Sequence, residues 1–241
     1  MAFYSEIVEA YDVIFPLNEA QLAFVEEACN GALESTTILD IGCGTGSLSI
    51  AMARRSARVR GFDFDEEMLC KAEEKRPQAL DLKFQQGDMR RVGEYFQPAV
   101  FDVSLCFGNT LVHLQSLQEV EGTIKAAANR LKKGGKLLIQ IVNYDRIIQN
   151  NVQSLPTITK DNYSFVRNYH HRDDGKVDFE TILTSPQSQI KNSVPLLMIK
   201  REELLQIMNL YFSDLKCYGG FNRTEWSESS FHLVVEAVKQ G

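Results

Sequence analysis

Three glycines at alternate positions, Gly42, Gly44 and Gly46, follow a short apolar segment that ends with Asp40 and Ile41. Glycine permits a sharp turn and lets a ligand approach the backbone closely. Apolar residues resume at helical spacing after the third glycine, so the stretch is predicted to form a strand, a glycine turn and a helix. Such a turn directs free backbone N–H groups and the positive end of a helix dipole into one pocket. We therefore expect an anionic or strongly polar ligand there.

A carboxylate stands at the expected end of the next strand, 21 positions after Gly42. At this place the carboxylate of Asp63 can accept hydrogen bonds from both ribose hydroxyls of a nucleoside. The alternative is that Asp63 caps the following helix, although Asp65 suits that role better because two glutamates and Met68 follow it. Phe64 and Met68 offer flat and polarisable apolar surface to an adenine ring, or they belong simply to the core.

An acidic residue also follows the third predicted strand, 80–85. Asp88 can accept a hydrogen bond from an adenine amino group, and the backbone N–H of Met89 can reach a ring nitrogen. A Gly-Asp pair is also common in ordinary turns. Because Asp88 stands third in a series of strand ends, its position favours contact with a nucleoside.

The glycine spacing differs from that of dinucleotide-binding proteins. Their G-x-G-x-x-G pattern places a third small residue five positions after the first glycine, whereas here the third glycine comes one position earlier and Ser47 follows it. With Asp40 just ahead, the stretch resembles the first motif of class I S-adenosylmethionine-dependent methyltransferases. Further segments stand in the order and at the distances of that family: Asp63, 87–89, 101–114 and 131–143.

A second group of polar residues follows the predicted strand 101–106. The segment 107–114 contains Asn109 and His113, and Tyr144 follows the predicted strand 137–142. These segments resemble those of the small-molecule branch that contains glycine and sarcosine N-methyltransferases. The resemblance implies direct SN2 transfer of a methyl group from S-adenosyl-L-methionine to a small-molecule nucleophile.

The resemblance also implies roles for individual residues. Asn109 is expected to orient the methyl acceptor, with His113 and Tyr144 lining the site and either able to take a proton; His113 could equally be a satisfied core histidine. The residues expected to bind the cofactor are Tyr4, Tyr11, Asp40, Gly42, Cys43, Gly44, Asp63, Phe64, Met68, Asp88, Met89, Phe107 and Gly108.

Two positions depart from the glycine N-methyltransferase pattern. Val142 stands where that family has an arginine that holds the substrate carboxylate, which argues against glycine as the substrate. Only Leu17 and Asn18 stand where the family has an arginine for the methionine carboxylate of the cofactor. Tyr4, Tyr11 or backbone N–H groups are the possible substitutes.

Hydrophobic periodicity predicts strands that alternate with helices, followed by a small antiparallel β insertion. The resemblance implies that the strands form a doubly wound, seven-stranded, mostly parallel α/β sheet. The domain is expected to comprise 1–154 and 199–241, and the resemblance implies that the insertion 155–198 covers the substrate site. Helices are predicted at 17–28, 47–55, 117–131 and 201–210, the third ended by Gly134-Gly135. Strands are predicted at 36–41, 58–62, 80–85, 101–106, 137–142, 163–169, 176–184, 188–199, 212–218 and 231–238, with Gly219-Gly220 as the last turn and Pro195 marking an edge strand.

Composition excludes several classes of function. The 241 residues carry a formal net charge of −6 and no long basic run, so a nucleic-acid substrate is not expected. The five cysteines are scattered, and His170-His171 with nearby aspartates is interpreted as a solvated hairpin tip, so no metal site is predicted. Neither a signal peptide nor a membrane-spanning run is apparent, and a cytoplasmic monomer or homodimer is expected.

Two alternatives stay open. The same fold could serve as a cofactor-sensing or partner-binding module without methyl transfer, whereas a nicotinamide dehydrogenase is disfavoured by Ser47. Within the insertion, Arg167 is the nearest cation that could meet an acidic group of the substrate. The insertion could instead extend a sheet edge or form a dimer surface, which would leave Arg167 solvated.

Overall fold

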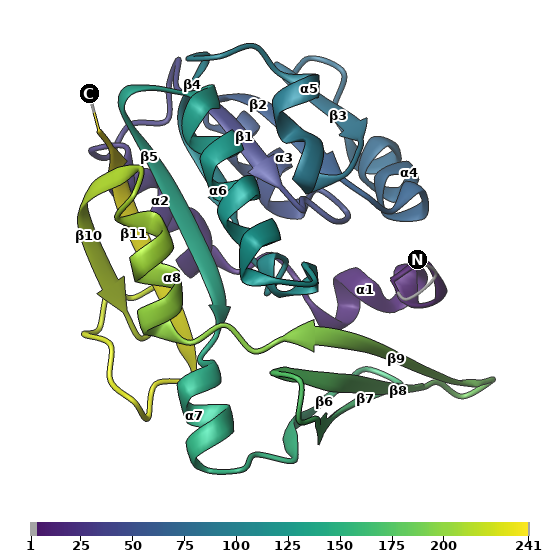
Figure 1. Cartoon of the computed structure of the whole chain (residues 1–241). Coiled ribbons are helices and arrows are strands. Elements are labelled where there is room, and N and C mark those ends of the chain that lie inside the picture. The colour runs from purple at the N-terminus through teal and green to yellow at the C-terminus, as the bar shows by residue number, and fades with distance from the viewer. Residues whose placement is uncertain (1–3, 241) are drawn as a thin grey trace.

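A computed structural model describes residues 4–240, and its main body is a seven-stranded sheet (Figure 1). The strand order is β10-β11-β5-β4-β1-β2-β3, and β1 to β5 run parallel. β11 is antiparallel to both β5 and β10. The strands are β1 (Thr37–Ile41), β2 (Arg58–Asp63), β3 (Leu82–Gln86), β4 (Phe101–Cys106), β5 (Leu131–Val142), β10 (Phe212–Tyr218) and β11 (His232–Lys239). The predicted doubly wound sheet is confirmed.

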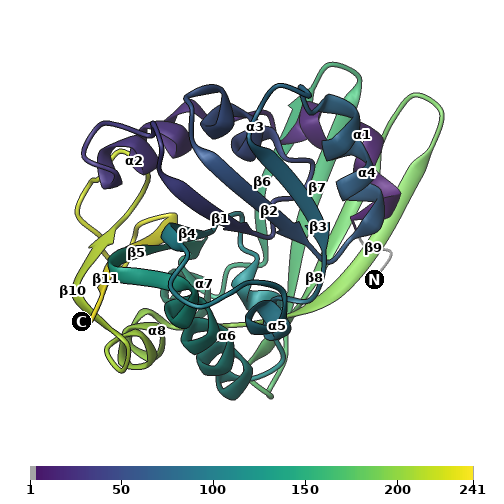
Figure 2. The same ribbon diagram turned by 90° about the horizontal axis from the view of Figure 1, so that it is seen from above.

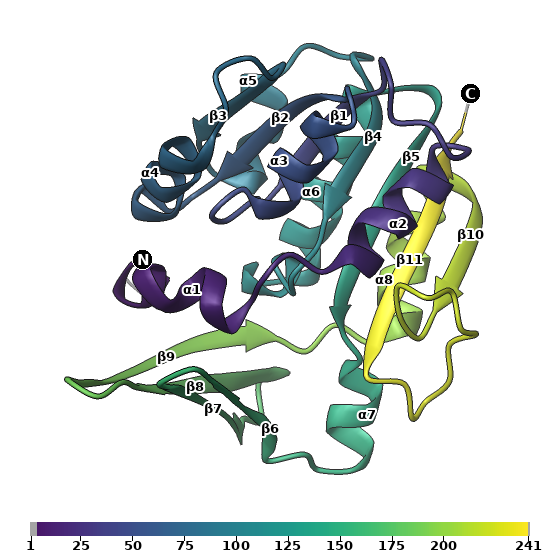
Figure 3. The same ribbon diagram turned by 180° about the vertical axis from the view of Figure 1, so that it is seen from behind.

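Helices cover both faces of this sheet (Figures 1 and 3). One face carries α2 (Glu19–Ala28), α3 (Ser47–Arg54) and α4 (Glu66–Lys75), and the other carries α5 (Val92–Tyr95), α6 (Leu117–Arg130) and α8 (Arg201–Met208). Alternate residues of the buried strands point to opposite faces, so Ile38 joins one core cluster and Leu39 and Ile41 join the other. This double burial explains the nearly continuous apolar runs of the parallel strands.

The strand order reverses between β1 and β4, which pair side by side in parallel. The chain therefore leaves these two strands toward opposite faces and opens a crevice at their carboxyl ends. Ligands of doubly wound sheets bind in such crevices. The glycine turn after β1 and the segment after β4 both lie there.

A separate four-stranded antiparallel sheet lies beyond these strand ends (Figures 1 and 2). Its strands are β6 (Ser154–Lys160), β7 (Tyr163–His171), β8 (Lys176–Thr184) and β9 (Gln189–Leu197), in the order β6-β7-β8-β9. β9 is an edge strand, as Pro195 predicted. β6 was missed, because Leu155 is its only buried residue and its pairing with β7 is broken between Leu155 and Ile158.

The amino-terminal segment packs between the two sheets and contacts both. It forms a 3-10 turn, η1 (Ser5–Ile7), and the helix α1 (Val8–Ile14). Ile7, Ala10 and Ile14 of this segment are buried against Phe165 and Leu183 of the small sheet. Among residues 4–240, no helix combines the length and the apolar character that a membrane span needs.

Two predicted boundaries are wrong. α6 ends at Arg130 and β5 already begins at Leu131, because Leu131 pairs with Phe101 on β4 before a register shift that contains both glycines. The connection from β10 to β11 is also no tight glycine turn but the loop 219–231. In this loop Gly219 N–H donates to the carbonyl of Thr224 at 2.8 Å.

At the predicted hairpin tip, Arg172 pairs with Asp174 and Asp178. His170 is exposed and lies 3.7 Å from a Glu180 oxygen, whereas the His171 ring bonds the Val152 carbonyl. Within the described part of the chain, no three His, Cys, Asp or Glu side chains are grouped to hold a metal ion.

Candidate functional site

The glycine turn after β1 has a backbone that other residues would adopt only with strain. Gly42 has φ +76° and Gly46 has φ +75°, and Gly46 is the N-cap of α3. A Cβ atom at Gly42 would stand 2.4 Å from Thr110 Cγ2, and one at Gly46 would stand 2.4 Å from Phe84 Cζ. The turn is therefore packed directly against the segment after β4 and against β3.

Asp63 is fixed at the end of β2 by the glycine turn itself. Its Oδ2 accepts a hydrogen bond from the Gly44 N–H at 2.7 Å, and its Oδ1 accepts one from the Asp65 N–H at 3.0 Å. Burial raises the pKa of the Asp63 carboxyl, and the two backbone bonds oppose that effect. Each carboxylate oxygen keeps a lone pair, so the group is oriented and still able to accept from a bound hydroxyl.

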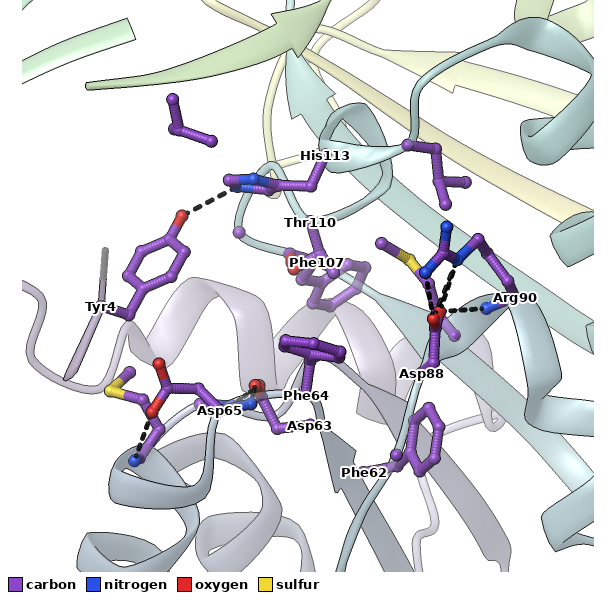
Figure 4. Close-up of a pocket in the computed structure, with 18 of the residues that line it drawn as sticks. Tyr4, Phe62, Asp63, Phe64, Asp65, Asp88, Arg90, Phe107, Thr110 and His113 are labelled. Atoms are coloured by element: carbon purple, nitrogen blue, oxygen red, sulfur yellow. Dashed lines mark hydrogen bonds and ion pairs between the residues drawn. The ribbon is translucent and has the colours of Figure 1, made fainter. Parts of the chain in front are cut away.

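A pocket, here called the strand-end pocket, opens beside Asp63 at the ends of β1 to β4 (Figure 4). Phe64 points into it with 53% of its surface exposed. Met68 also lines the pocket but is otherwise buried. On the opposite wall Asp88 forms an ion pair with Arg90, and this bond lowers the pKa of the Asp88 carboxyl. An exposed aromatic ring between two carboxylates suits a flat, polar heterocycle.

A second cavity, here called the inter-sheet cavity, lies between the main sheet and the small sheet. Its walls come from α1, from the ends of β1, β4 and β5, and from the inner face of β6 to β9. Some residues line both the strand-end pocket and the inter-sheet cavity, namely Tyr4, Tyr11, Gly42, Phe107, Gly108 and His113. A ligand in one site would therefore lie next to a ligand in the other.

The structure brings together all the predicted cofactor residues. The strand-end pocket is lined by Gly44, Asp63, Phe64, Met68, Asp88 and Met89, and the inter-sheet cavity by Asp40 and Cys43. The remaining ones line both, as described above. Asp40 is buried with its Oδ2 accepting from Ser49 Oγ at 2.6 Å, and burial raises the pKa of its carboxyl to about 6.

His113 and Tyr4 form a polar contact on the shared wall. The Tyr4 hydroxyl lies 3.0 Å from His113 Nε2, and the rings meet edge to face. Burial lowers the pKa of His113 to about 4 and raises the pKa of the Tyr4 hydroxyl far above its usual value. Both groups are therefore neutral near pH 7 and can orient a bound nucleophile without adding charge.

Asn109 and Tyr144 are tied to the scaffold more firmly than the sequence suggested. Asn109 has φ +68°, its Oδ1 accepts from the Val142 N–H at 2.9 Å, and its Nδ2 donates to the Tyr144 hydroxyl at 3.1 Å. Asn109 lines the inter-sheet cavity, but Tyr144 is fully buried and lines neither site. The expectation that Tyr144 lines the site is not met, because its hydroxyl is used to hold Asn109.

The contacts of Asp12 at the site were not predicted from the sequence. Asp12 on α1 accepts hydrogen bonds from Thr45 Oγ1 at 2.5 Å and from Ser47 Oγ at 3.1 Å, and it pairs with Lys75 at 2.5 Å. It thus fastens α1 to the glycine turn and to α4. The local signal in the sequence is the pair of hydroxyls on Thr45 and Ser47, which flank Gly46, and they do not identify their partner.

The two positions at which the sequence lacks an arginine of the glycine N-methyltransferase pattern both lie at the inter-sheet cavity. Val142 is buried, and it lines the inter-sheet cavity together with Leu17 and Asn18. The Asn18 side chain accepts from Ala20 N–H as the cap of α2. Neither position therefore supplies a cation to the cavity wall.

His113 makes stability depend on pH in a predictable direction. Its pKa is 6.5 in an unfolded chain and about 4 in the fold, so protonation favours unfolding once the pH drops below 6.5. The full contribution is present above pH 6.5 and is lost as the pH falls through about 4. We expect His113→Gln to remove about 3 kcal/mol of this dependence, measured by urea unfolding across that range. Asp40, whose pKa is raised, makes stability change with pH in the opposite direction, but it does so equally in the wild type and in His113→Gln. Its contribution therefore cancels when the two proteins are compared. If the unfolding free energies of the two proteins change in parallel with pH, the prediction is contradicted.

Together, the fold and its pocket define a nucleoside-binding α/β protein of the doubly wound class. The glycine turn, the carboxylate after β2 and the exposed ring beside it fit the ribose and base of a nucleoside. Comparison with known proteins indicates which kind of nucleoside-binding protein this chain resembles.

Residues 38–135 match the family profile of a methyltransferase domain. A ubiquinone biosynthesis O-methyltransferase of Idiomarina loihiensis is 36% identical over 131 residues, which are 53% of this chain and 50% of that protein. A glycine/sarcosine N-methyltransferase of Aphanothece halophytica is 29% identical over 200 residues, covering 82% of this chain and 74% of that protein. A solved S-adenosylmethionine-dependent methyltransferase from Clostridium acetobutylicum shares the fold, with a TM-score of 0.82, 18% identity and 99% of both chains covered.

Over residues 38–135 the chain matches a methyltransferase domain, and it is similar to S-adenosylmethionine-dependent methyltransferases in sequence and in fold. It spans about half the length of the first curated relative that it matches. The cofactor of this class is S-adenosylmethionine, whose nucleoside part suits the strand-end pocket.

Proposed function

We propose that this protein transfers a methyl group from S-adenosylmethionine to a nucleophile of a small molecule by direct displacement. The observation that carries the proposal is the shared wall between the strand-end pocket and the inter-sheet cavity. A nucleoside-containing cofactor in the pocket would place its reactive end beside an acceptor in the cavity. Two adjoining sites of this kind suit the transfer of a group between their ligands.

The strand-end pocket would hold the cofactor through contacts that this chain already orients. Asp63 would accept from the ribose hydroxyls, and Phe64 and Met68 would contact the base. Asp88 would accept from the amino group of the base while it remains paired with Arg90. The methionine part would lie toward Tyr4, Tyr11, Asp40, Cys43, Phe107, Gly108 and the glycines at 42 and 44.

When bound, the cofactor supplies an electrophilic methyl group on a positively charged sulfur. The chain has to align the nucleophile with that group and to exclude water, and alignment alone can contribute on the order of 7–11 kcal/mol. His113 lies at the shared wall in its neutral form, so its free nitrogen lone pair or N–H can orient the nucleophile. Because its pKa is near 4, His113 is a weak base, and a nucleophile that arrives unprotonated is the better substrate.

The insertion 155–198 is proposed to cover the acceptor. Its inner face supplies Leu155, Ile158, Phe165, Tyr169 and Phe179 to the inter-sheet cavity. These apolar and aromatic walls can remove water from the reacting atoms. Asn109 is proposed to position the acceptor from the opposite wall, with Tyr144 behind it.

A small molecule is the proposed acceptor. The cavity lies between two sheets, and the chain has a net charge of −6, which disfavours a nucleic acid. The segment after β4 also lacks the Asn/Asp-Pro-Pro-aromatic run that methyltransferases of flipped bases use. The names of the two curated relatives refer to ubiquinone biosynthesis and to glycine and sarcosine, and this supports the same choice.

The proposal is tested in two steps. Calorimetry with S-adenosylmethionine is expected to show binding, and libraries of amines, carboxylates and phenols are then screened for release of S-adenosylhomocysteine. Release with at least one small acceptor is the expected result. No detectable cofactor binding would contradict the proposal. Binding without turnover across the libraries would instead favour a cofactor-sensing module on the same fold.

A further inference from the structure

The inner face of the small sheet is apolar except for one row of polar residues. Cross-strand pairing places Arg167 on β7 opposite Thr181 on β8, and Thr181 opposite Asn192 on β9. On either side of this row the same face carries Phe165, Tyr169, Phe179, Leu183, Ile190 and Val194. A buried charged or polar group inside an apolar face is costly unless it is paired.

Arg167 is the charged member of this row, and residues 4–240 provide no acidic side chain as its ion-pair partner. Its Nη2 donates to the Pro156 carbonyl at 2.7 Å, while its Nε is buried without a hydrogen-bond partner. Among residues 4–240, no acidic side chain lies within 4 Å of it. Burial lowers the pKa of the guanidinium, although the group stays charged near pH 7.

Arg167 also lies where a methyl acceptor would bind. It lines the inter-sheet cavity beside Phe165 and Tyr169. The Tyr169 hydroxyl is buried without a hydrogen-bond partner, as is Arg167 Nε. A bound acceptor with oxygen atoms could therefore satisfy two neighbouring polar atoms of β7 that the described part of the protein leaves without partners.

We propose that Arg167 binds an oxyanion group of the methyl acceptor, which makes the acceptor an anionic molecule. The remaining guanidinium N–H groups form a fork that matches a carboxylate or a phosphate, and a charge-assisted bond would satisfy the buried Nε. This inference rests on the proposed function, since it assigns a substrate class to the same cavity. The apolar wall around Arg167 accommodates the uncharged part of such a molecule.

The first test measures binding without turnover. Thermal unfolding of the wild type and of Arg167→Gln is followed with acetate, 4-aminobenzoate or inorganic phosphate, and with acetamide and 4-aminobenzamide as neutral counterparts. All samples have equal ionic strength and are measured with and without S-adenosylhomocysteine. At least one anion is expected to raise Tm in the wild type but not in Arg167→Gln, and comparison of the carboxylates with phosphate identifies the oxyanion. Equal shifts in the two proteins with every anion would overturn the inference.

The second test uses turnover with paired acceptors, each an amine carrying either a carboxylate or the matching carboxamide. Arg167→Gln is expected to lower kcat/KM for the carboxylate by about ten- to hundredfold, mainly through KM, and to leave the carboxamide nearly unchanged. Arg172→Gln is the control, because Arg172 lies at the exposed end of the same sheet and pairs with Asp174 and Asp178. An unchanged preference in Arg167→Gln overturns the inference, whereas absence of cofactor binding in the wild type contradicts the proposed function alone.

Discussion

Asp63→Ala is expected to weaken the binding of S-adenosylmethionine by about a hundredfold, the largest effect of any single side chain in the strand-end pocket. The variant removes the proposed acceptor of two ribose hydroxyls, and hydrogen bonds to a charged group contribute about 1.5–3 kcal/mol each. It also releases the Gly44 and Asp65 N–H groups that the carboxylate holds at 2.7 and 3.0 Å. Isothermal calorimetry of the wild type and the variant measures the loss directly.

A ligand cycle separates the two effects of Asp63→Ala. An S-adenosylhomocysteine analogue without ribose hydroxyls should bind the wild type weakly and should lose little further affinity in the variant. Asp81→Ala is the matched control, since Asp81 is half-exposed, lies outside both sites and pairs with Arg58 and Arg60. If the analogue and the parent ligand lose the same affinity in Asp63→Ala, Asp63 acts on the turn and not on the ribose.

Gly42→Ala is expected to disrupt both stability and cofactor binding. The new Cβ would stand 2.4 Å from Thr110 Cγ2 and 2.6 Å from Thr110 Oγ1, on a backbone with φ +76°. The clash and the left-handed strain together are expected to cost about 3 kcal/mol, or about 10 °C in Tm for a domain of this size. Differential scanning calorimetry and cofactor titration measure the two losses.

A second substitution divides this cost into its parts. Adding Thr110→Gly should recover the steric part of the stability and leave the left-handed strain. Gly122→Ala is the control, because Gly122 lies in α6 with no atom within 4 Å of an added Cβ, and alanine there favours the helix. A Gly42→Ala protein that melts like the wild type would show that the turn relaxes freely.

For elements with a strong apolar pattern, the first and last residues could be predicted exactly from the sequence. The boundaries of β4, β8 and β10 coincide with the predicted 101–106, 176–184 and 212–218. Their apolar or alternating runs are long enough to dominate every competing local preference. β6 has no such pattern, since its place is set by pairing with β7.

The site residues that directly follow a strand could be predicted from the sequence. Asp63 and Asp88 follow the second and third predicted strands, and the carboxyl ends of parallel strands lie at one edge of the sheet, so both side chains were expected at the same pocket. Asp12 was not predictable, because its bonds to Thr45 and Ser47 join segments more than 30 positions apart. Tyr144 was misplaced for a related reason: a tyrosine after a strand end can face a cavity or the core, and only tertiary packing decides which.

Because Tyr4 and Tyr11 belong to both ligand sites, the affinities for cofactor and acceptor are expected to be linked. The segment that carries them is held by Asp12 at the glycine turn and by Ile7, Ala10 and Ile14 at the small sheet. Whichever ligand arrives first orders a surface that the second also contacts, and such coupling is reciprocal by thermodynamic necessity. The demethylated cofactor would then keep the methylated product in place, and product release becomes a candidate for the slow step of turnover.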